Sequence, residues 1–120
     1  MPGAWPFWRA AYFMSWIYLS LAIAFEVAGT TCMKASVGLT KLSPSFLMGI
    51  FYAGCFCFLT LTLKRLPVGV AYAIWSGIGT ALIATIGVLY FREPISWLKV
   101  AGLAAIIIGV VALNLSGGTR

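Results

Sequence analysis

Four long apolar runs occupy most of this 120-residue sequence, and they limit the structures that it can form. Each run can cross a bilayer, because about 20 residues at ~1.5 Å rise per residue cover the roughly 30 Å hydrocarbon core. The runs are continuous and about twice as long as a membrane strand, which favours helices. With 62% hydrophobic and 8% charged residues, the chain cannot cover a water-exposed surface. The predicted spans are residues 16–33, 45–63, 68–91 and 97–115.

These runs predict an all-α integral membrane protein with one four-helix transmembrane domain, residues 16–115. Residues 1–15 carry Trp5, Trp8, Arg9 and Tyr12, residue types that gather at membrane interfaces, so we expect an interfacial extension there. No short apolar core followed by a small-residue cleavage site precedes the spans, and we expect no cleaved signal. Residues 116–120 form a short C-terminal tail. The connections are too short for a soluble domain, so the function is expected within or beside the membrane.

The net charge of +6 does not indicate a nucleic-acid partner, because the basic residues stand singly or in pairs near the helix ends, where Lys and Arg meet headgroups. Cys32, Cys55 and Cys57 lie in apolar runs without paired spacing, and the chain has no histidine. We therefore interpret the cysteines as packing residues and expect no metal, no other cofactor and no enzymatic activity.

The Lys and Arg residues divide equally between the two sides of a four-span chain. Orientation normally follows their excess on the cytoplasmic side, so a balanced chain has no strong preference. One hypothesis is that the protein inserts in both orientations and pairs head to tail; the other is that one weak bias decides. One side carries Arg9, Lys64, Arg65 and Arg120, and the other Lys34, Lys41, Arg92 and Lys99.

Small residues form a narrow stripe on the fourth predicted helix. Gly102, Ala105, Gly109 and Ala112 fall at positions i, i+3, i+7 and i+10, so another helix can approach closely there. The stripe fits packing within one chain or between two copies. Four short helices enclose little space, so a polar cavity is easier to form between two copies.

Glu26 is the only acid within the four predicted spans, and it lies near the middle of the first. An ionised carboxylate there costs at least about 2.5 kcal/mol, so it is expected to face a cavity or a partner. Such a group can exchange a proton for a cation. The helical period places mostly small or adaptable residues on the same face, and these are predicted to line a pocket: Ala22, Gly29, Thr30 and Met33.

Aromatic residues recur at helical spacing in the second and third spans. Tyr52 is followed by Phe56, and Tyr72 by Trp75 and Ser76. Such stripes usually pack helices together, but beside an unpaired acid their faces can attract a cation and tyrosine hydroxyls can hold a carboxylate.

The third span also contains Gly77 and Gly79 near its middle, where glycine allows a helix to kink. This Gly-x-Gly lacks the strand and third glycine of a nucleotide-binding motif.

Two segments resemble the small multidrug resistance transporter family, and the similarity extends over residues 16–115. They are the run around Glu26 at residues 18–34 and the run Leu-Pro-Val-Gly-Val-Ala-Tyr-Ala-Ile-Trp-Ser-Gly-Ile-Gly at residues 66–79. The resemblance implies an antiparallel dual-topology homodimer that exports cations in exchange for protons. It also implies the roles of individual residues: Glu26 as the shared proton and substrate site, Tyr52, Tyr72, Trp75 and Phe56 in the pocket, and Gly102 with Gly109 at the dimer contact.

The expected function is therefore a proton-coupled antiporter of hydrophobic or quaternary ammonium cations in the bacterial inner membrane. Exporters of that subtype resemble this chain in carrying a small residue three positions after the glutamate, here Gly29. Phe25 and the Arg92-Glu93-Pro94 segment instead resemble guanidinium exporters, which remain the alternative. A structural membrane subunit without transport is a further alternative, and a paralogous partner is compatible with the sequence.

Overall fold

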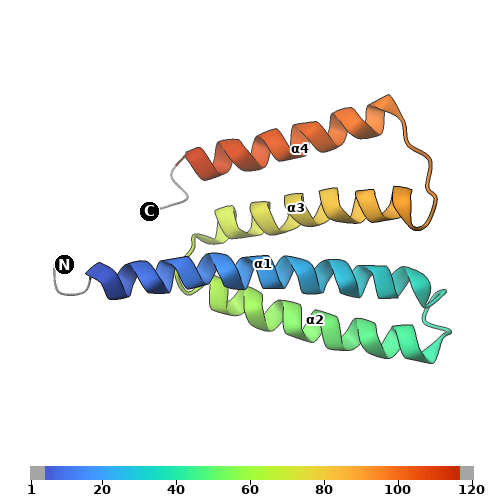
Figure 1. Ribbon diagram of the computed structural model, residues 1–120, viewed down its shortest axis with the longest axis horizontal. Helices are drawn as coiled ribbons and strands as arrows, with labels where there is room; N and C mark the ends of the chain where they lie inside the picture. The colour runs from blue at the N-terminus through green and yellow to red at the C-terminus, as the bar shows by residue number, and fades with distance from the viewer. Residues whose placement is uncertain (1–4, 117–120) are drawn as a thin grey trace.

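The protein consists of four long α-helices joined by short connections (Figure 1). The computed structural model describes residues 5–116, and the side chains of residues 5–9 and 11 lie outside that description. No strand occurs within residues 5–116, and all four helices are long and apolar enough to cross a membrane. The predicted fold class is confirmed. The helices are α1 (Trp5–Ala35), α2 (Leu42–Thr62), α3 (Val68–Leu89) and α4 (Trp97–Leu115).

Some helix ends differ from the ends of the predicted spans, and residues at the ends explain where a helix begins. Helix α2 begins at Leu42 rather than residue 45, because Pro44 is tolerated in the first turn, where no intrahelical N–H bond is lost. Helix α4 begins as predicted: Ser96 caps it, its hydroxyl accepting from the backbone N–H of Lys99 at 3.1 Å.

Helix α1 begins well before the predicted first span, and its apolar membrane-crossing part is Tyr12–Ala35. The interfacial role of residues 1–15 stays a prediction. Residues 1–4 of that segment and 117–120 of the tail lie outside the described part of the chain.

The helices lie side by side in a slab rather than a closed bundle. Their order across the slab is α2, α1, α3, α4, with packing of α1 on α2, α1 on α3 and α3 on α4 (Figure 1). The molecule measures 54 × 35 × 18 Å, and its thinnest dimension is not far above the ~10–12 Å diameter of one helix. Helix α4 therefore stands at one edge and has no buried residue.

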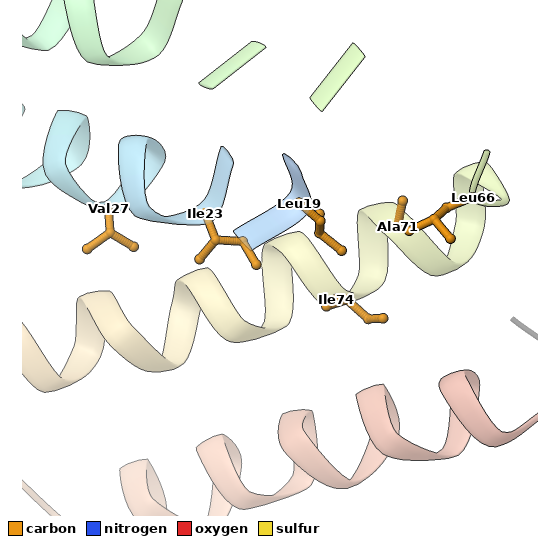
Figure 2. Packing of buried hydrophobic residues seen from close by; sticks show 6 residues of the cluster. All are labelled: Leu19, Ile23, Val27, Leu66, Ala71 and Ile74. Atoms are coloured by element: carbon orange, nitrogen blue, oxygen red, sulfur yellow. The ribbon is translucent and has the colours of Figure 1, made fainter. Parts of the chain in front are cut away.

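Large aliphatic side chains join α1 to α3. Leu19, Ile23 and Val27 recur every fourth residue along one stripe of α1 and meet Ala71 and Ile74 of α3 (Figure 2). Leu66, just before α3, closes the cluster at one end. This seam fixes the rotation of α1 and hence the direction of Glu26.

Aromatic rings join α1 to α2. The ring of Phe25 lies over Gly54, where a Cβ atom would overlap it. The same ring makes edge-to-face contacts with Phe51 and Phe58, at centroid distances of 5.8 and 5.4 Å. A residue with any side chain at position 54 would push the helices apart, so Gly54 sets their separation.

The connections place basic residues at both ends of the slab. The α1–α2 and α3–α4 connections share one end, and the α2–α3 connection lies at the other, with the start of α1 and the end of α4 (Figure 1). This up-and-down topology agrees with the predicted division of Lys and Arg. The side chain of Arg9 and the whole of Arg120 lie outside the described residues.

Candidate functional site

Glu26 lies within the membrane-crossing part of α1 and is half-buried. Its Oε1 atom accepts a hydrogen bond of 3.0 Å from the hydroxyl of Thr30, one turn later. Residues four apart lie on one face of a helix, so the sequence itself positions this hydroxyl beside the carboxylate. Within the membrane this bond offsets part of the cost of the acid.

Tyr52 of α2 extends the hydrogen bonding across the α1–α2 contact. Its phenolic oxygen lies 2.6 Å from the hydroxyl oxygen of Thr30. Threonine has a single hydroxyl proton, and Thr30 gives it to Glu26, so Tyr52 is the donor in this second bond. The result is a chain of two hydroxyls, from Tyr52 through Thr30 to Glu26, directed at the carboxylate.

Two buried glycines provide the space for this arrangement. A Cβ atom at Gly29 would stand 2.9 Å from the Tyr52 ring. A Cβ atom at Gly79 of α3 would stand 3.1 Å from Oε2 of Glu26. Both distances are shorter than ordinary van der Waals contact, so the ring and the carboxylate rest directly on glycine backbone. The acid is thus held among α1, α2 and α3.

Trp75 of α3 lies at the edge of the α1–α3 core and stacks on Tyr72, with ring centroids 5.3 Å apart. Its indole nitrogen is buried and makes no hydrogen bond to a described residue. The fully buried Cys55 of α2 lies beside Trp75, without full hydrogen-bond geometry to the indole. An unpaired buried donor is costly, so this N–H is suited to an incoming acceptor.

Other predicted pocket residues lie at the surface of the single chain. Tyr72 is 57% exposed, Phe56 55% and Met33 43%. Ser76 is also exposed, and its hydroxyl donates to the backbone oxygen of Tyr72 at 2.8 Å. Ala22 is fully buried and packs inside the slab. One chain therefore brings together Glu26, Gly29, Thr30 and Tyr52, and leaves much of the aromatic surface uncovered.

The two predicted kink residues let side chains of neighbouring helices lie close to the backbone of α3. Gly79 faces Glu26, and at Gly77 a Cβ atom would overlap Val110 of α4 and stand 3.2 Å from Ile106. Helix α3 is continuous through both positions. Their role as a kink stays a prediction.

The small-residue stripe of α4 is exposed along its whole length. A Cβ atom at Gly102 or Gly109 would meet no other atom within 4 Å. The stripe is thus not used for packing within the described chain. Its exposed members are Gly102, Ala105, Gly109 and Ala112.

Sequence reasoning overlooked Cys55 and Gly54. Cys55 is fully buried, as expected of a packing residue, and it also lies beside Trp75. Its position three residues after Tyr52, on the same helical face, was the available signal. The role of Gly54 had no such signal, because it depends on the Phe25 ring of another helix. Within the described residues no three potential metal-binding side chains come together.

A single acid within four apolar helices, bonded to Thr30 and through it to Tyr52, is typical of small membrane transporters. Comparison with known proteins identifies the family. The family described as Small Multidrug Resistance protein matches residues 14–106, and the chain belongs to it. It is a multi-pass protein of the bacterial inner membrane.

Several bacterial relatives match most of the chain. A membrane protein of Bacillus subtilis, YvaE, is 57% identical over 102 residues, which cover 85% of this chain and 86% of that protein. The nicotine metabolites export pump subunit NepA of Paenarthrobacter nicotinovorans is 45% identical, with 86% and 89% coverage. The quaternary ammonium compound-resistance protein QacE of Escherichia coli is also 45% identical, with 83% and 91% coverage.

Proposed function

We propose that this protein is a proton-coupled antiporter that exports hydrophobic or quaternary ammonium cations. The observation that carries the proposal is the position of Glu26, the one acid of the spans, held by Thr30 and lying against the backbone of Gly79. A carboxylate in this place binds either a proton or a cation. Proton entry on one side can then drive cation exit from the other.

The hydrogen-bonded hydroxyls support a switch between these two states. With Glu26 ionised, Thr30 donates to the carboxylate and Tyr52 donates to Thr30. When a proton or cation occupies the carboxylate, both hydroxyls can rotate and find other acceptors. The state of the acid is thereby coupled to Tyr52, and through Tyr52 to the position of α2.

A second copy of the chain completes the proposed pocket. Tyr72, Phe56 and Met33 are exposed in one chain, and the small-residue stripe of α4 is uncovered. We propose an antiparallel homodimer in which the two Glu26 residues share one cavity and the α4 stripes meet. Balanced basic residues at the two ends support insertion in both orientations. The relative NepA is named as a pump subunit, so pairing with a paralogous chain is the alternative assembly.

Several relatives are named for resistance to quaternary ammonium compounds, and these names support bulky cations rather than guanidinium as the substrates of this protein. The space at Gly29 supports the same choice, because it lets the Tyr52 ring lie close to α1. A cation with large apolar groups then gains contact with Tyr72 and Trp75, worth about 0.5–2 kcal/mol per cation–π contact.

The test is transport by purified protein in liposomes. With an inward proton gradient, wild-type protein should exchange tetraphenylphosphonium against protons faster than guanidinium, and Glu26→Gln should abolish exchange while the protein still assembles. Preference for guanidinium would indicate the alternative subtype. No coupled flux of either cation would indicate a structural membrane subunit and refute the proposal.

A further inference from the structure

A groove runs along α1 on the face opposite Glu26. Residues 24, 28, 31 and 35 lie about 140–200° around the helix from position 26, at 3.6 residues per turn. Two adjoining hollows of about 560 and 520 Å³ share Thr31, Cys32 and Ile86 and so form one continuous groove. Its lining residues come from α1, α2 and α3. Helix α1 passes between α2 and α3 (Figure 1).

The groove forms because its side chains on α1 are small and those on α2 and α3 are large. Its floor on α1 is made of small residues, including Ala24, Ala28 and Ala35, whereas its walls on α2 and α3 carry large ones. The hydroxyl of Thr31 needs no hydrogen-bond acceptor in the groove, because it donates to the backbone oxygen of Val27 at 2.8 Å. The groove is therefore apolar along its floor. Its large wall residues are Leu47, Phe51, Leu82 and Ile86.

The length of the groove corresponds to one leaflet of a bilayer. From Ala24 to Ala35 the floor extends about 16 Å at ~1.5 Å per residue, close to half of the roughly 30 Å hydrocarbon core. Its inner end at Ala24 lies midway along the membrane-crossing part of α1, Tyr12–Ala35. Its outer end, beside Ser43 and Tyr90, lies at the helix ends, where tyrosine meets headgroups.

The connections at this outer end carry more basic than acidic residues. Lys41 stands two residues before Ser43, and Arg92 two residues after Tyr90, and both side chains are exposed. Lys34 is exposed at the same end, while the amino group of Lys99 donates to the backbone oxygen of Pro94 at 2.9 Å. Glu93 is the one acid in these connections. Basic clusters beside gaps between membrane helices attract anionic headgroups.

We infer that this groove binds an anionic phospholipid, with one acyl chain on the α1 floor and the phosphate between Lys41 and Arg92. The groove has the length of one leaflet and an apolar floor, which match a single acyl chain. The bound lipid contacts α1, α2 and α3 on the side away from Glu26. It therefore steadies the three helices that hold the acid without competing for the cation.

The test counts lipids that stay bound. Full-length protein is reconstituted in equal parts of phosphatidylglycerol and phosphatidylcholine, extracted, and measured by native mass spectrometry. Wild type should retain phosphatidylglycerol preferentially. Lys41→Glu with Arg92→Glu should lower that preference about tenfold or more. The matched control is Lys64→Glu with Arg65→Glu, two exposed bases at the opposite end, which should leave it unchanged.

A second variant tests the groove itself. Ala24→Leu with Ala28→Leu fills the floor and should remove the retained lipid, whereas Ala104→Leu on the exposed face of α4 should not. Undiminished retention by the filled variant would overturn the inference, as would equal losses from both charge reversals. A changed oligomeric mass with unchanged lipid would place a second protein copy in the groove and would also overturn it.

Discussion

The carboxylate of Glu26 lies against the backbone of Gly79, so that a Cβ atom at position 79 would stand 3.1 Å from its Oε2 atom. The acid on α1 and the glycine on α3 are thus one structural unit, although 53 positions separate them in the sequence. Any side chain at position 79 has to move the carboxylate. This relationship makes the position of the acid testable without changing the acid itself.

Gly79→Ala should weaken cation binding by about two- to tenfold, the scale of ~0.4–1.4 kcal/mol, because the added methyl group displaces the carboxylate by a few tenths of an ångström. Titration calorimetry on the purified protein measures this. Gly69→Ala is the matched control, since it lies in the first turn of the same helix and its Cβ would meet nothing within 4 Å. Equal affinity of the two variants would refute the contact.

The hydroxyl chain predicts coupling between two residues on different helices. Tyr52→Phe and Thr30→Val should each change cation affinity by about 1 kcal/mol, and the double variant should change it by clearly less than the sum. Tyr18→Phe, on a ring stacked against Phe58, is the control and should have little effect. Strict additivity in this double-mutant cycle would mean that the two hydroxyls act independently.

Gly29→Ala should displace the Tyr52 ring, because its Cβ would stand 2.9 Å from two ring atoms. We expect weaker binding of tetraphenylphosphonium and a smaller effect on guanidinium, which needs less aromatic contact. Competitive binding of the two cations to wild type and variant measures this difference. An equal loss for both cations would show that the ring does not select for cation size.

The sequence predicted the number and character of the helices because each apolar run is long and uninterrupted. It could not predict their order across the slab, since nearly every helical face is apolar and periodicity then indicates no neighbour. The hydrogen bond from Thr30 to Glu26 could be predicted from the sequence, because residues four apart share a helical face. The contacts at Gly29, Gly54 and Gly79 were not, because each depends on a ring or carboxylate from another helix.

The proposed antiparallel pairing predicts an effect of charge on activity. Adding two or three lysines to the α1–α2 connection should fix the chain in one orientation and lower export when this variant is expressed alone. Co-expression with a variant biased the other way, carrying added lysine in the α2–α3 connection, should restore export. Full export from a population shown to have one orientation would exclude the dual-orientation assembly.

The proposed mechanism requires a proton and a cation to compete for Glu26. Calorimetry of cation binding, over a series of pH values and in two buffers with different heats of ionisation, measures both affinity and the protons released. We predict that affinity falls as pH is lowered, because protonated Glu26 cannot offset a cation's charge. We also predict that binding releases protons from wild type and none from Glu26→Gln. Affinity that stays constant with pH, with no proton release from wild type, would contradict the shared site.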